Sequence, residues 1–475
     1  MAGEKNMSSA RLLGDVVVLG LGRTGEAAAR YLASLAPGRV RSVTLYGGAS
    51  SAEGERTRAL EAAGVRVVTG TEEVSGSFDL AVTSPGIPLD APFARSAAAC
   101  SRELVGEVEL AFRESPERWV AVTGTNGKTT TTSLVTHLLR EGGLEASSVG
   151  NIGTPPTELV AGRPAGGWLV AELSSFQLAA TTSFHPRVAV LLNVTPDHLE
   201  WHHTMEAYAA AKERALANLG AADLAVVSVD DDWCRAAARR CEERGLRVCR
   251  LSTAGDPGSP CAAFLREGTL VVRLDGAEHV LLDASELKIF GTHNAENALA
   301  AAACALELGV ADELVRSGLR SFSPIEHRIE PAGEVGGVRY VNDSKATNTD
   351  SVEKALTAFP AGTVVLMLGG HDKMTDLSSL ASAVCARCRV AVCFGEAGER
   401  IAAALEAARA ASGSGLAVLR APHLREAFDA AVASARPGET VLLSPACSSF
   451  DEFSNMAERG RLFKRLVREL SGEGA

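Results

Sequence analysis

Short apolar runs alternate with alanine-rich, helical stretches along most of the chain. An apolar run at Asp15–Gly20 ends in a glycine turn, the stretch Glu26–Leu35 has a helical pattern, and a second apolar run follows at Val43–Tyr46. Apolar runs that are bounded by glycine and separated by helical stretches are typical of β-α-β units with a buried parallel sheet. The same alternation continues as far as Ser115, where we expect a first α/β domain to end.

The alternation then begins again twice. Trp119–Thr123 is an apolar run followed by a glycine turn and a helical stretch, and more apolar runs follow (168–171, 188–192, 224–229). The segment Thr253–Asp283 has short alternating runs, which indicate peripheral hairpins or loops. Helical stretches at 294–308 and 313–319 lead to a last series of apolar runs (338–341, 364–368, 390–394, 440–443). We therefore predict an α/β protein with three domains in series: 10–114, 115–322 and 323–475.

Length and charge support this organisation and exclude some classes of function. A chain of 475 residues is too long for one core, because domains usually have about 100–200 residues. With 47 basic and 58 acidic side chains, the formal charge is -11, so no chain-wide positive field exists to hold nucleic acid or an anionic membrane. The apolar runs are far shorter than the roughly 20 residues of a membrane span, and Met1–Arg11 lacks an apolar signal core. We expect a cytoplasmic monomer without membrane insertion.

The first glycine turn, Gly20-Leu21-Gly22-Arg23-Thr24-Gly25, is a G-x-G-x-x-G pattern directly after a strand. Backbone N–H groups at the start of the next helix can bind a pyrophosphate there. The acidic residue that binds the ribose of a dinucleotide is absent from its usual position, where the chain has Tyr46-Gly47-Gly48. The turn therefore predicts diphosphate binding, and a dinucleotide cofactor or a purely structural turn are the alternatives.

The second glycine turn predicts ATP binding with Mg²⁺. It lies between an apolar strand and a helix and consists of Gly124, Thr125, Asn126, Gly127, Lys128, Thr129 and Thr130. Its backbone N–H groups can surround phosphates, Lys128 can neutralise the β- and γ-phosphate oxygens, and the Thr129 hydroxyl can ligate Mg²⁺. Val122 stands where the longer Walker pattern has its first glycine, so the motif is a shortened P-loop.

Candidate metal ligands follow the next strands of the second domain. Glu172 ends an apolar run, and a carboxylate beside a P-loop is a suitable oxygen ligand for Mg²⁺. His198 follows the end of another strand, where ligands gather in open α/β sheets, so it could bind a second metal or a substrate, or else cap a helix or fill the core. We expect His202 and His203 to be solvated. The residues around Lys212, on the helical stretch 205–216, predict only a hydrated surface charge.

Polar groups near the second domain junction could contribute to ligand binding. Asn294 and Asn297 open an alanine-rich helix, and their amides could contact a base or cap the helix. Arg328 and the segment Asn342–Asn348 offer charge and hydrogen bonds for phosphate or carboxylate groups, although interdomain ion pairs would use the same residues. Two residues that follow other strands of the third domain could hold a small carboxylated substrate or serve in ordinary turns: Lys373 and Ser449.

Several of these segments, in this order, resemble the Mur ligase family, which shares its central ATPase module with folylpolyglutamate synthase. The resemblance covers nearly the whole chain and rests on GTNGKTT, AELSSFQL, LNVTPDHLEWH, GTHNAENALAA and HRIE. Two further motifs, VNDSKATNTDS and LLSPACSSFDEFSNMAERG, resemble in particular the D-glutamate-adding branch of the family. The resemblance implies a Rossmann-like N-terminal domain, a central P-loop ATPase domain with a parallel sheet, and a Rossmann-like C-terminal domain.

The resemblance also implies roles for individual residues. The residues implied in catalysis are Lys128, His198 and Lys212. Those implied as metal ligands are Thr129, Glu172, His198 and Lys212. Lys212 would be carbamylated, which would make it an oxygen ligand. Besides the P-loop, the residues implied at ATP are Asn294, Asn297, Arg328 and Asp343. Those implied near D-glutamate are Lys345, Thr347, Lys373 and Ser449, and those implied near a uridine diphosphate substrate are Arg23, Thr24, Gly86 and Asn151.

The implied reaction joins D-glutamate to UDP-N-acetylmuramoyl-L-alanine through an acyl phosphate, with release of ADP and phosphate, in peptidoglycan precursor synthesis. Two positions depart from the family pattern: Tyr46 and the glycines after it replace an acidic residue used near uracil, and Met456 stands where an aromatic residue is common. The alternatives are a related ligase with another acceptor, a folylpolyglutamate synthase, a noncatalytic nucleotide-binding regulator and a nicotinamide dehydrogenase.

Overall fold

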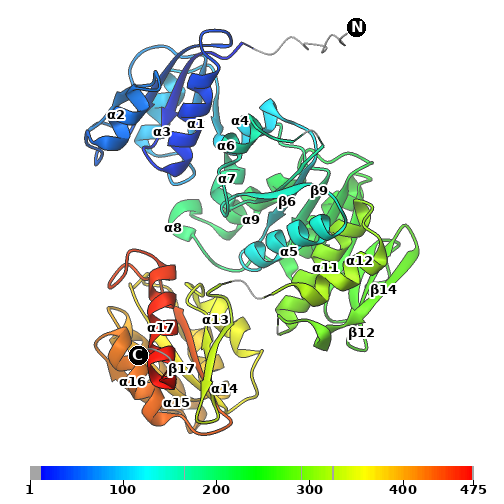
Figure 1. The fold of residues 1–475 in the computed structure, drawn as a ribbon, viewed down its shortest axis with the longest axis vertical. Coiled ribbons are helices and arrows are strands. Elements are labelled where there is room, and N and C mark those ends of the chain that lie inside the picture. Colours follow the sequence, from blue (N-terminus) through cyan, green and yellow to red (C-terminus); the bar gives the residue numbers. More distant parts are fainter. Residues whose placement is uncertain (1–11, 165, 290, 324–325, 473–475) are drawn as a thin grey trace. The chain divides into compact units, whose positions relative to one another are not determined.

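The computed structural model describes residues 12–164, 166–289, 291–323 and 326–472. Met1–Arg11 and the predicted outer domain limits at residues 10 and 475 lie outside the described residues. The described chain forms three α/β domains with mainly parallel sheets, as predicted (Figure 1). The first two sheets belong to one compact unit, which includes Asn297–Gly318, and the third belongs to a second unit with Asp283–Glu296. The boundaries 10–114, 115–322 and 323–475 stay predictions.

The first sheet has the strand order β3-β2-β1-β4-β5, with every neighbouring pair parallel. Its strands are β1 (Gly14–Leu19), β2 (Val40–Tyr46), β3 (Arg66–Val68), β4 (Leu80–Thr83) and β5 (Leu104–Gly106), and its helices are α1 (Arg23–Ser34), α2 (Glu55–Glu61) and α3 (Pro92–Ala99). The chain runs outward from β1 to β3 and then returns to β4 on the other side of β1. The carboxyl ends of β1 and β4 therefore form a topological switch point, where open α/β sheets bind ligands.

Helix α4 (Glu107–Glu114) connects this sheet to the second, whose order is β14-β13-β12-β11-β10-β9-β6-β8-β7. The strands are β6 (Trp119–Thr123), β7 (Ala146–Gly150), β8 (Trp168–Glu172), β9 (Val188–Leu191), β10 (Leu224–Ser228), β11 (Arg247–Ser252), β12 (Ala262–Arg266), β13 (Thr269–Leu274) and β14 (Ala277–Asp283). Strand β6 lies between β9 and β8, which gives this sheet its own switch point at the glycine turn. The antiparallel pairing of β12 with β13 confirms the predicted peripheral hairpin.

Helices cover the second sheet and carry most of the candidate site. They are α5 (Lys128–Glu141), α6 (Pro156–Val160), α7 (Ser175–Ala179), α8 (Leu199–His202), α9 (Met205–Glu213) and α10 (Asp232–Glu243), with the 3-10 turn η1 (Arg214–Leu216), and most of α11 (Thr292–Glu307) and α12 (Asp312–Ser321). The 3-10 turn η2 (Ala284–Glu286) and the first residues of α11 belong to the second unit. The core beneath them includes an edge-to-face cluster of Phe112, Trp119 and Phe184. These rings fix α4 and the segment before β9 against the end of β6 where the chain enters the sheet.

The third sheet has the order β15-β16-β20-β17-β18-β19, and its first pair is antiparallel. Its strands are β15 (Glu330–Val335), β16 (Val338–Asn342), β17 (Val364–Gly369), β18 (Cys388–Phe394), β19 (Ala417–Ala421) and β20 (Thr440–Ala446). Its helices are α13 (Thr349–Leu356), α14 (Ser378–Arg387), α15 (Gly398–Ser412), α16 (Leu424–Ser434) and α17 (Met456–Ser471). Because β20 inserts between β16 and β17 in parallel with both, the loops that follow these strands meet at one edge.

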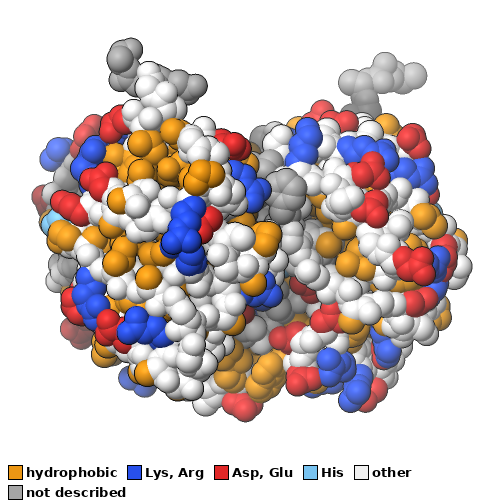
Figure 2. Space-filling view, turned by 90° about the horizontal axis from the view of Figure 1, so that it is seen from below, with side chains coloured by type: hydrophobic (Ala, Val, Ile, Leu, Met, Phe, Trp, Pro, Cys, Tyr) orange, Lys and Arg blue, Asp and Glu red, His pale blue; other side chains and the backbone are white. Residues whose placement is uncertain are grey.

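The surface agrees with the mixed charge of the sequence. On the face drawn in Figure 2, Lys and Arg side chains are interspersed with Asp and Glu rather than gathered into one basic patch. Among the described residues, the helices lack the combination of length and apolar character that crossing a membrane requires.

Candidate active site

The second glycine turn owes its shape to two glycines. Gly124 has φ of 153° and Gly127 has φ of 83°, in the left-handed region that favours glycine. A Cβ atom on Gly127 would lie 2.4 Å from the side-chain oxygen Oδ1 of Asn297. That same oxygen accepts a hydrogen bond of 3.1 Å from the Thr131 hydroxyl on α5. The predicted ATP residue Asn297 is therefore in contact with the turn and its helix.

Asn193, directly beyond β9, holds the turn from the side of the sheet. Its Oδ1 accepts from the backbone N–H of Asn126 at 2.8 Å, and its backbone oxygen accepts from the N–H of Thr125 at 2.8 Å. The hydroxyl groups of Thr125 and Tyr208 are 3.0 Å apart. Sequence reasoning gave Asn193 and Tyr208 no role. The available signal for Asn193 was its position after a buried strand, next to the predicted ligand edge.

Two lysines from distant segments converge on one carbonyl of the turn. The Nζ atom of Lys128 donates to the carbonyl oxygens of Gly124 at 2.9 Å and Thr125 at 2.7 Å. The Nζ atom of Lys212 donates to the same Gly124 oxygen at 2.7 Å. Lys212 is 2% exposed, so the surface charge predicted from its helical stretch is wrong. Its helix α9 buries the face with Tyr208, whose ring centre lies 4.6 Å from Nζ, and the many alanines hide that face in the sequence.

Burial and the nearby positive charge of Lys128 lower the pKa of Lys212 well below its usual value, and Asp197 opposes this shift. A buried ammonium is costly without a close carboxylate, so the environment favours the neutral amine. A neutral amine is nucleophilic, and this is the form that can react with carbon dioxide to give a carbamate. The surroundings of Lys212 therefore fit the modification that the resemblance implies.

Glu172 offers an oxygen for a cation. It is 2% exposed, and its Oε1 accepts a hydrogen bond of 2.8 Å from the Asn151 side chain. Its buried Oε2 has no hydrogen-bond partner among the described residues, and the same is true of the buried Thr130 hydroxyl. Buried polar atoms normally have partners, so these two atoms fit a metal-nucleotide site. Asn151, predicted near the uridine diphosphate substrate, thus lies against a predicted metal ligand.

The described residues do not contain three His, Cys, Asp or Glu side chains gathered into a ready metal site. The predicted set accordingly depends on a hydroxyl, from the buried Thr129, and on a modified Lys212, besides Glu172 and His198. His198 has φ of 54°, and its ring centre is 4.7 Å from that of Phe176. Its side chain is 39% exposed, which leaves it accessible to a ligand.

His202, the last residue of α8, and His203, which follows it, differ in burial. The prediction of a solvated His202 is wrong: it is 6% exposed, and its Nε2 is 2.8 Å from the Ser175 hydroxyl. Burial lowers the pKa of His202 to about 4, so it is neutral at pH 7. His203 is exposed, as predicted, and its Nε2 lies 3.0 Å from a carboxylate oxygen of Asp90.

In the second unit, Asp343 directly follows β16 and interacts electrostatically with Arg328. Asp343 accepts hydrogen bonds from the Ile329 N–H at 3.2 Å and the Ser444 hydroxyl at 2.8 Å. Burial raises the pKa of Asp343 to about 6, against the opposing effect of the Arg328 charge. The buried Nε of Arg328 has no hydrogen-bond partner among the described residues. Asn294, also predicted at ATP, is buried in the first turn of α11.

The residues predicted near D-glutamate come from loops that meet at that edge. The Lys373 ammonium donates to the Thr347 carbonyl at 3.0 Å, and the Lys345 N–H donates to the His327 carbonyl at 3.0 Å. Ser449 is 2% exposed and lies in the loop after β20. That loop contacts the loop after β17 through a backbone hydrogen bond of 3.0 Å from His371 to Ser448.

Arg459 of α17 donates hydrogen bonds to two of these loops. Sequence reasoning gave this residue no role. It is 0% exposed and donates to the Ser344 carbonyl at 2.9 Å and to the carbonyls of Cys447 and Ser448 at 3.0 and 3.1 Å. Nothing in the local sequence distinguishes this arginine from the exposed ones on the same helix. Its role depends on the tertiary arrangement of the loops.

The first glycine turn is more open. A Cβ on Gly25 would lie 2.0 Å from the Gly20 oxygen, so this glycine allows α1 to pack closely on β1. The Ser84 hydroxyl donates to the Leu19 carbonyl at 2.7 Å, which brings the loop with Gly86 against the turn. Two of the predicted substrate residues here, Arg23 and Gly86, are exposed, and Thr24 is half-buried. Arg23 lines a cavity of about 500 Å³ between α1, α2 and α6.

Tyr46 occupies the position where the family has an acidic residue, but its hydroxyl makes a different contact. It is 5% exposed, and its hydroxyl oxygen accepts a hydrogen bond of 3.3 Å from the Ser75 N–H. The Tyr46 hydroxyl therefore makes its hydrogen bond within the first domain.

Comparisons with known proteins agree with this geometry. The model of the Mur ligase middle domain matches residues 122–305, and that of the Mur ligase glutamate ligase domain matches residues 327–447. The UDP-N-acetylmuramoylalanine–D-glutamate ligase of Acidobacterium capsulatum is 40% identical, over 97% of this chain and 97% of that protein. The enzyme of the same name from Pelotomaculum thermopropionicum is 40% identical over 96% of this chain and 97% of its own. The chain belongs to the Mur ligase family.

Solved structures of more distant proteins share the Mur ligase fold. A pseudomurein peptide ligase type C from Methanothermus fervidus has a TM-score of 0.59 at 16% identity and covers 95% of this chain and 99% of its own. UDP-N-acetylmuramate-alanine ligase MurC from Thermotoga maritima has a TM-score of 0.56 at 20% identity, over 96% of this chain and 99% of its own. These likenesses extend the three-domain Mur ligase architecture over nearly the whole chain.

Proposed function

We propose that this Mur ligase uses ATP to join D-glutamate to UDP-N-acetylmuramoyl-L-alanine, through an acyl phosphate, in peptidoglycan precursor synthesis. The observation that carries the proposal is the convergence of Lys128 and Lys212 on the Gly124 carbonyl after β6, together with Glu172 at the end of the neighbouring strand β8, whose Oε2 has no hydrogen-bond partner among the described residues. Full-length relatives with the name UDP-N-acetylmuramoylalanine–D-glutamate ligase support this choice of substrates.

The first step activates the alanyl carboxylate. A free carboxylate is a poor acylating agent because oxide would have to leave, whereas a phosphorylated carboxylate loses phosphate. In this step a carboxylate oxygen bonds to the γ-phosphorus of ATP, and the bond from that phosphorus to the ADP oxygen breaks. Lys128 and the N–H groups of the turn neutralise the charge that develops on the phosphoryl oxygens. Bound Mg²⁺, held by Thr129, Glu172, His198 and carbamylated Lys212, would add positive charge there.

The second step forms the amide. The D-glutamate nitrogen bonds to the acyl carbon, the bond from that carbon to the phosphate oxygen breaks, and the amine loses a proton. Four residues of the third domain, which lie in loops at one sheet edge, would bind the carboxylates of D-glutamate: Lys345, Thr347, Lys373 and Ser449. Holding the amine near the acyl carbon replaces a random encounter with a directed one.

The remaining predicted binding residues belong to two sites, one at each glycine turn. Asn294, Asn297, Arg328 and Asp343 would complete the ATP site together with the second turn. Arg23, Thr24 and Gly86 would bind the uridine diphosphate part of the substrate at the first turn, where exposed N–H groups at the start of α1 suit a diphosphate. Asn151 would contact that substrate while it orients Glu172. We also propose that the protein works as a cytoplasmic monomer.

The experiment is to incubate the purified protein with ATP, Mg²⁺, UDP-N-acetylmuramoyl-L-alanine and D-glutamate. We expect ADP and phosphate to form only when both other substrates are present, and a product that is heavier than the nucleotide substrate by one glutamyl residue in mass spectrometry. L-Glutamate should not replace D-glutamate. A folded protein that binds ATP but forms no amide would be a nucleotide-binding regulator, and the proposal would be wrong.

A further inference from the structure

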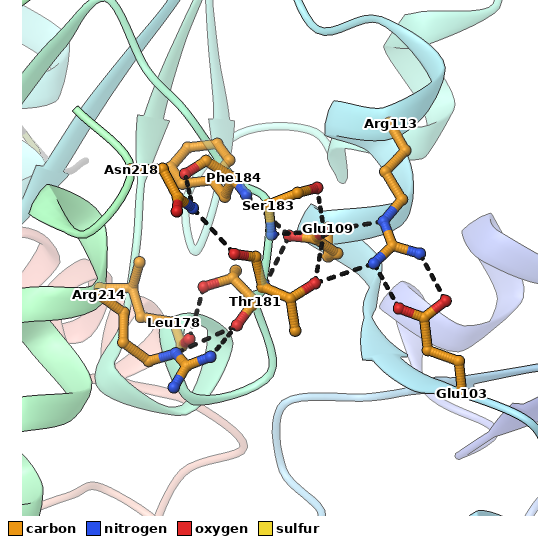
Figure 3. A network of polar contacts seen from close by, with 10 residues as sticks. Glu103, Glu109, Arg113, Leu178, Thr181, Ser183, Phe184, Arg214 and Asn218 are labelled. Carbon is orange, nitrogen blue, oxygen red and sulfur yellow. Dashed lines mark hydrogen bonds and ion pairs between the residues drawn. The ribbon is translucent and has the colours of Figure 1, made fainter. Parts of the chain in front are cut away.

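A short turn that follows α7 is held from two sides (Figure 3). Residues Thr181–Phe184 lie between α7 and β9, and the carboxylate of Glu109, which is 0% exposed, comes from α4. It accepts from the N–H groups of Thr182 and Ser183 at 2.9 Å each and from that of Phe184 at 3.1 Å. Burial alone would raise the pKa of Glu109, but hydrogen bonds from the Ser183 hydroxyl, from the Thr182 and Ser183 N–H groups and from Arg113 outweigh it and lower the pKa to about 2.

The carbonyl side of the same turn is held by the segment after α9. The guanidinium of Arg214 donates through Nε, at 3.1 Å, and through Nη2 to the Thr181 carbonyl. The side-chain amide of Asn218 donates to the carbonyls of Thr182 and Phe184 at 2.9 Å each. An anion on the N–H side and donors on the carbonyl side leave the turn little freedom to shift, because each movement breaks charge-assisted hydrogen bonds.

The two segments joined by this turn carry candidate metal ligands. Glu172 ends β8 and leads through α7 to Thr181, while Lys212 lies in the last turn of α9, two residues before Arg214. The contact between Arg214 and Thr181 therefore ties together the far ends of the segments that present Glu172 and Lys212. Mg²⁺ demands nearly ideal octahedral geometry at about 2.1 Å, so a small shift of either segment would weaken its binding.

We propose that Arg214 and Glu109 are positioning residues, which set the separation of Glu172 and Lys212 by holding the turn Thr181–Phe184 from opposite sides. The inference rests on the proposed function, because it assumes that these two side chains bind metal. Partners that orient metal ligands without touching the metal usually change affinity or rate by about 10–100-fold when they are removed.

The chain offers a matched control in Arg244, which directly follows α10. Its Nη1 donates to the Leu216 carbonyl at 3.1 Å and its Nη2 to the Ala217 carbonyl at 2.8 Å. Arg244 thus holds the same segment after α9 by the same kind of bond. Among the described residues, Arg244 makes no hydrogen bond with the turn Thr181–Phe184, so its removal separates general support of the segment from support through the turn.

The experiment compares the full-length wild type with Arg214→Ala, Arg214→Lys, Glu109→Gln and Arg244→Ala. The readouts are the Kd of Mn²⁺ in the presence of ADP, from electron paramagnetic resonance titration, kcat, the KM for D-glutamate, and the melting temperature. We expect Arg214→Ala to raise the Mn²⁺ Kd and lower kcat by about tenfold each, with the KM for D-glutamate within about twofold of wild type. Arg214→Lys should recover part of the loss, and Arg244→Ala should stay within about twofold of wild type in both quantities.

The proposal is overturned if Arg214→Ala and Arg244→Ala lower the melting temperature alike and leave the Mn²⁺ Kd and kcat near those of wild type. A wild-type chain that takes up no Mn²⁺ with ADP overturns it as well. If Glu109→Gln does not fold, the arginine variants still decide the question. Absence of amide formation in wild type would defeat the proposed function, while the Mn²⁺ titration would continue to report on positioning.

Discussion

The two glycine turns of the first unit start from the same local design and become different sites. Each follows a strand at the switch point of a parallel sheet and opens onto a helix, α1 or α5. In the first turn, a Cβ on Gly22 would meet no described atom within 4 Å, and Arg23 is exposed. In the second, Gly127 is pressed against Asn297, and Lys212 reaches the turn from 88 positions further along the chain.

The difference shows what a strand-turn-helix unit supplies by itself. Backbone N–H groups at the start of a helix are enough to bind an anion, and both turns have them. Stabilising a reaction requires charged groups that are held in a buried environment before the substrate arrives. Among the residues that the structure describes, such a group reaches the second turn from a distant segment and none reaches the first, so we expect changes at the second turn to affect the rate and changes at the first turn to affect binding.

The largest effect should follow Lys128→Ala. This change removes the ammonium that faces the turn, and we expect amide formation to fall by about a thousandfold, since neutralisation of phosphoryl charge is the main contribution expected from this residue. The measurement is product formation by mass spectrometry together with ADP release, and the melting temperature serves as a control for folding. Activity within about tenfold of wild type would show that Lys128 is not at the reacting phosphate.

Lys212→Ala should come next, with a loss of about a hundredfold or more, because it removes the side chain that would become an oxygen ligand. A short carboxylic acid such as formate or propionate should restore part of the activity, since it can enter the space left beside Gly124 and supply an oxygen anion. The same acids should not restore Lys128→Ala, which lacks a cation. Full activity of Lys212→Ala without any additive would contradict a role for this buried lysine.

A smaller effect should distinguish Gly127→Ala from Gly22→Ala. Gly127 has φ of 83°, and its added Cβ would lie 2.4 Å from Asn297 Oδ1, so we expect a loss of about 1–3 kcal/mol in unfolding free energy and weaker ATP binding. Gly22 has φ of -103° and open space around it, so alanine should change stability by less than about 0.5 kcal/mol. Denaturant unfolding and calorimetric titration with ATP would measure both, and equal losses would contradict the contrast between the turns.

The smallest effect should be that of Arg23→Ala at the open turn. An exposed arginine that contacts a diphosphate contributes to binding in the ground state and the transition state alike, so we expect the KM for UDP-N-acetylmuramoyl-L-alanine to rise by about five- to tenfold with kcat nearly unchanged. Steady-state kinetics with varied nucleotide substrate would measure this. A fall in kcat with unchanged KM would place Arg23 in the chemistry instead.

The fold was predictable because buried parallel strands leave continuous apolar runs in a sequence. Strands β7 and β11 were not predicted, since the serines of Ala146–Gly150 and the arginines of Arg247–Ser252 interrupt the apolar pattern. The two glycine turns were recognisable because their backbone geometry demands particular residues at fixed spacing.

The candidate site was harder to predict from the sequence than the fold. Lys212 and His202 were expected in solvent, and both are buried, because alanine-rich or very short helices do not reveal which face packs inward. The contacts of Asn193, Tyr208 and Arg459 depend on segments far apart in the chain. Such roles depend on tertiary structure, which local spacing and propensity do not encode.

The ammonium of Lys128 already has two carbonyl partners in its own turn, those of Gly124 and Thr125. At the proposed ATP site, an incoming phosphate would therefore exchange hydrogen bonds with the turn rather than create them, and only the difference between the two sets would contribute to affinity. On departure of ADP, the lysine would return to its carbonyls instead of being left unsatisfied. In the proposed cycle the loop would thereby return to its starting arrangement, which would work against tight retention of ADP.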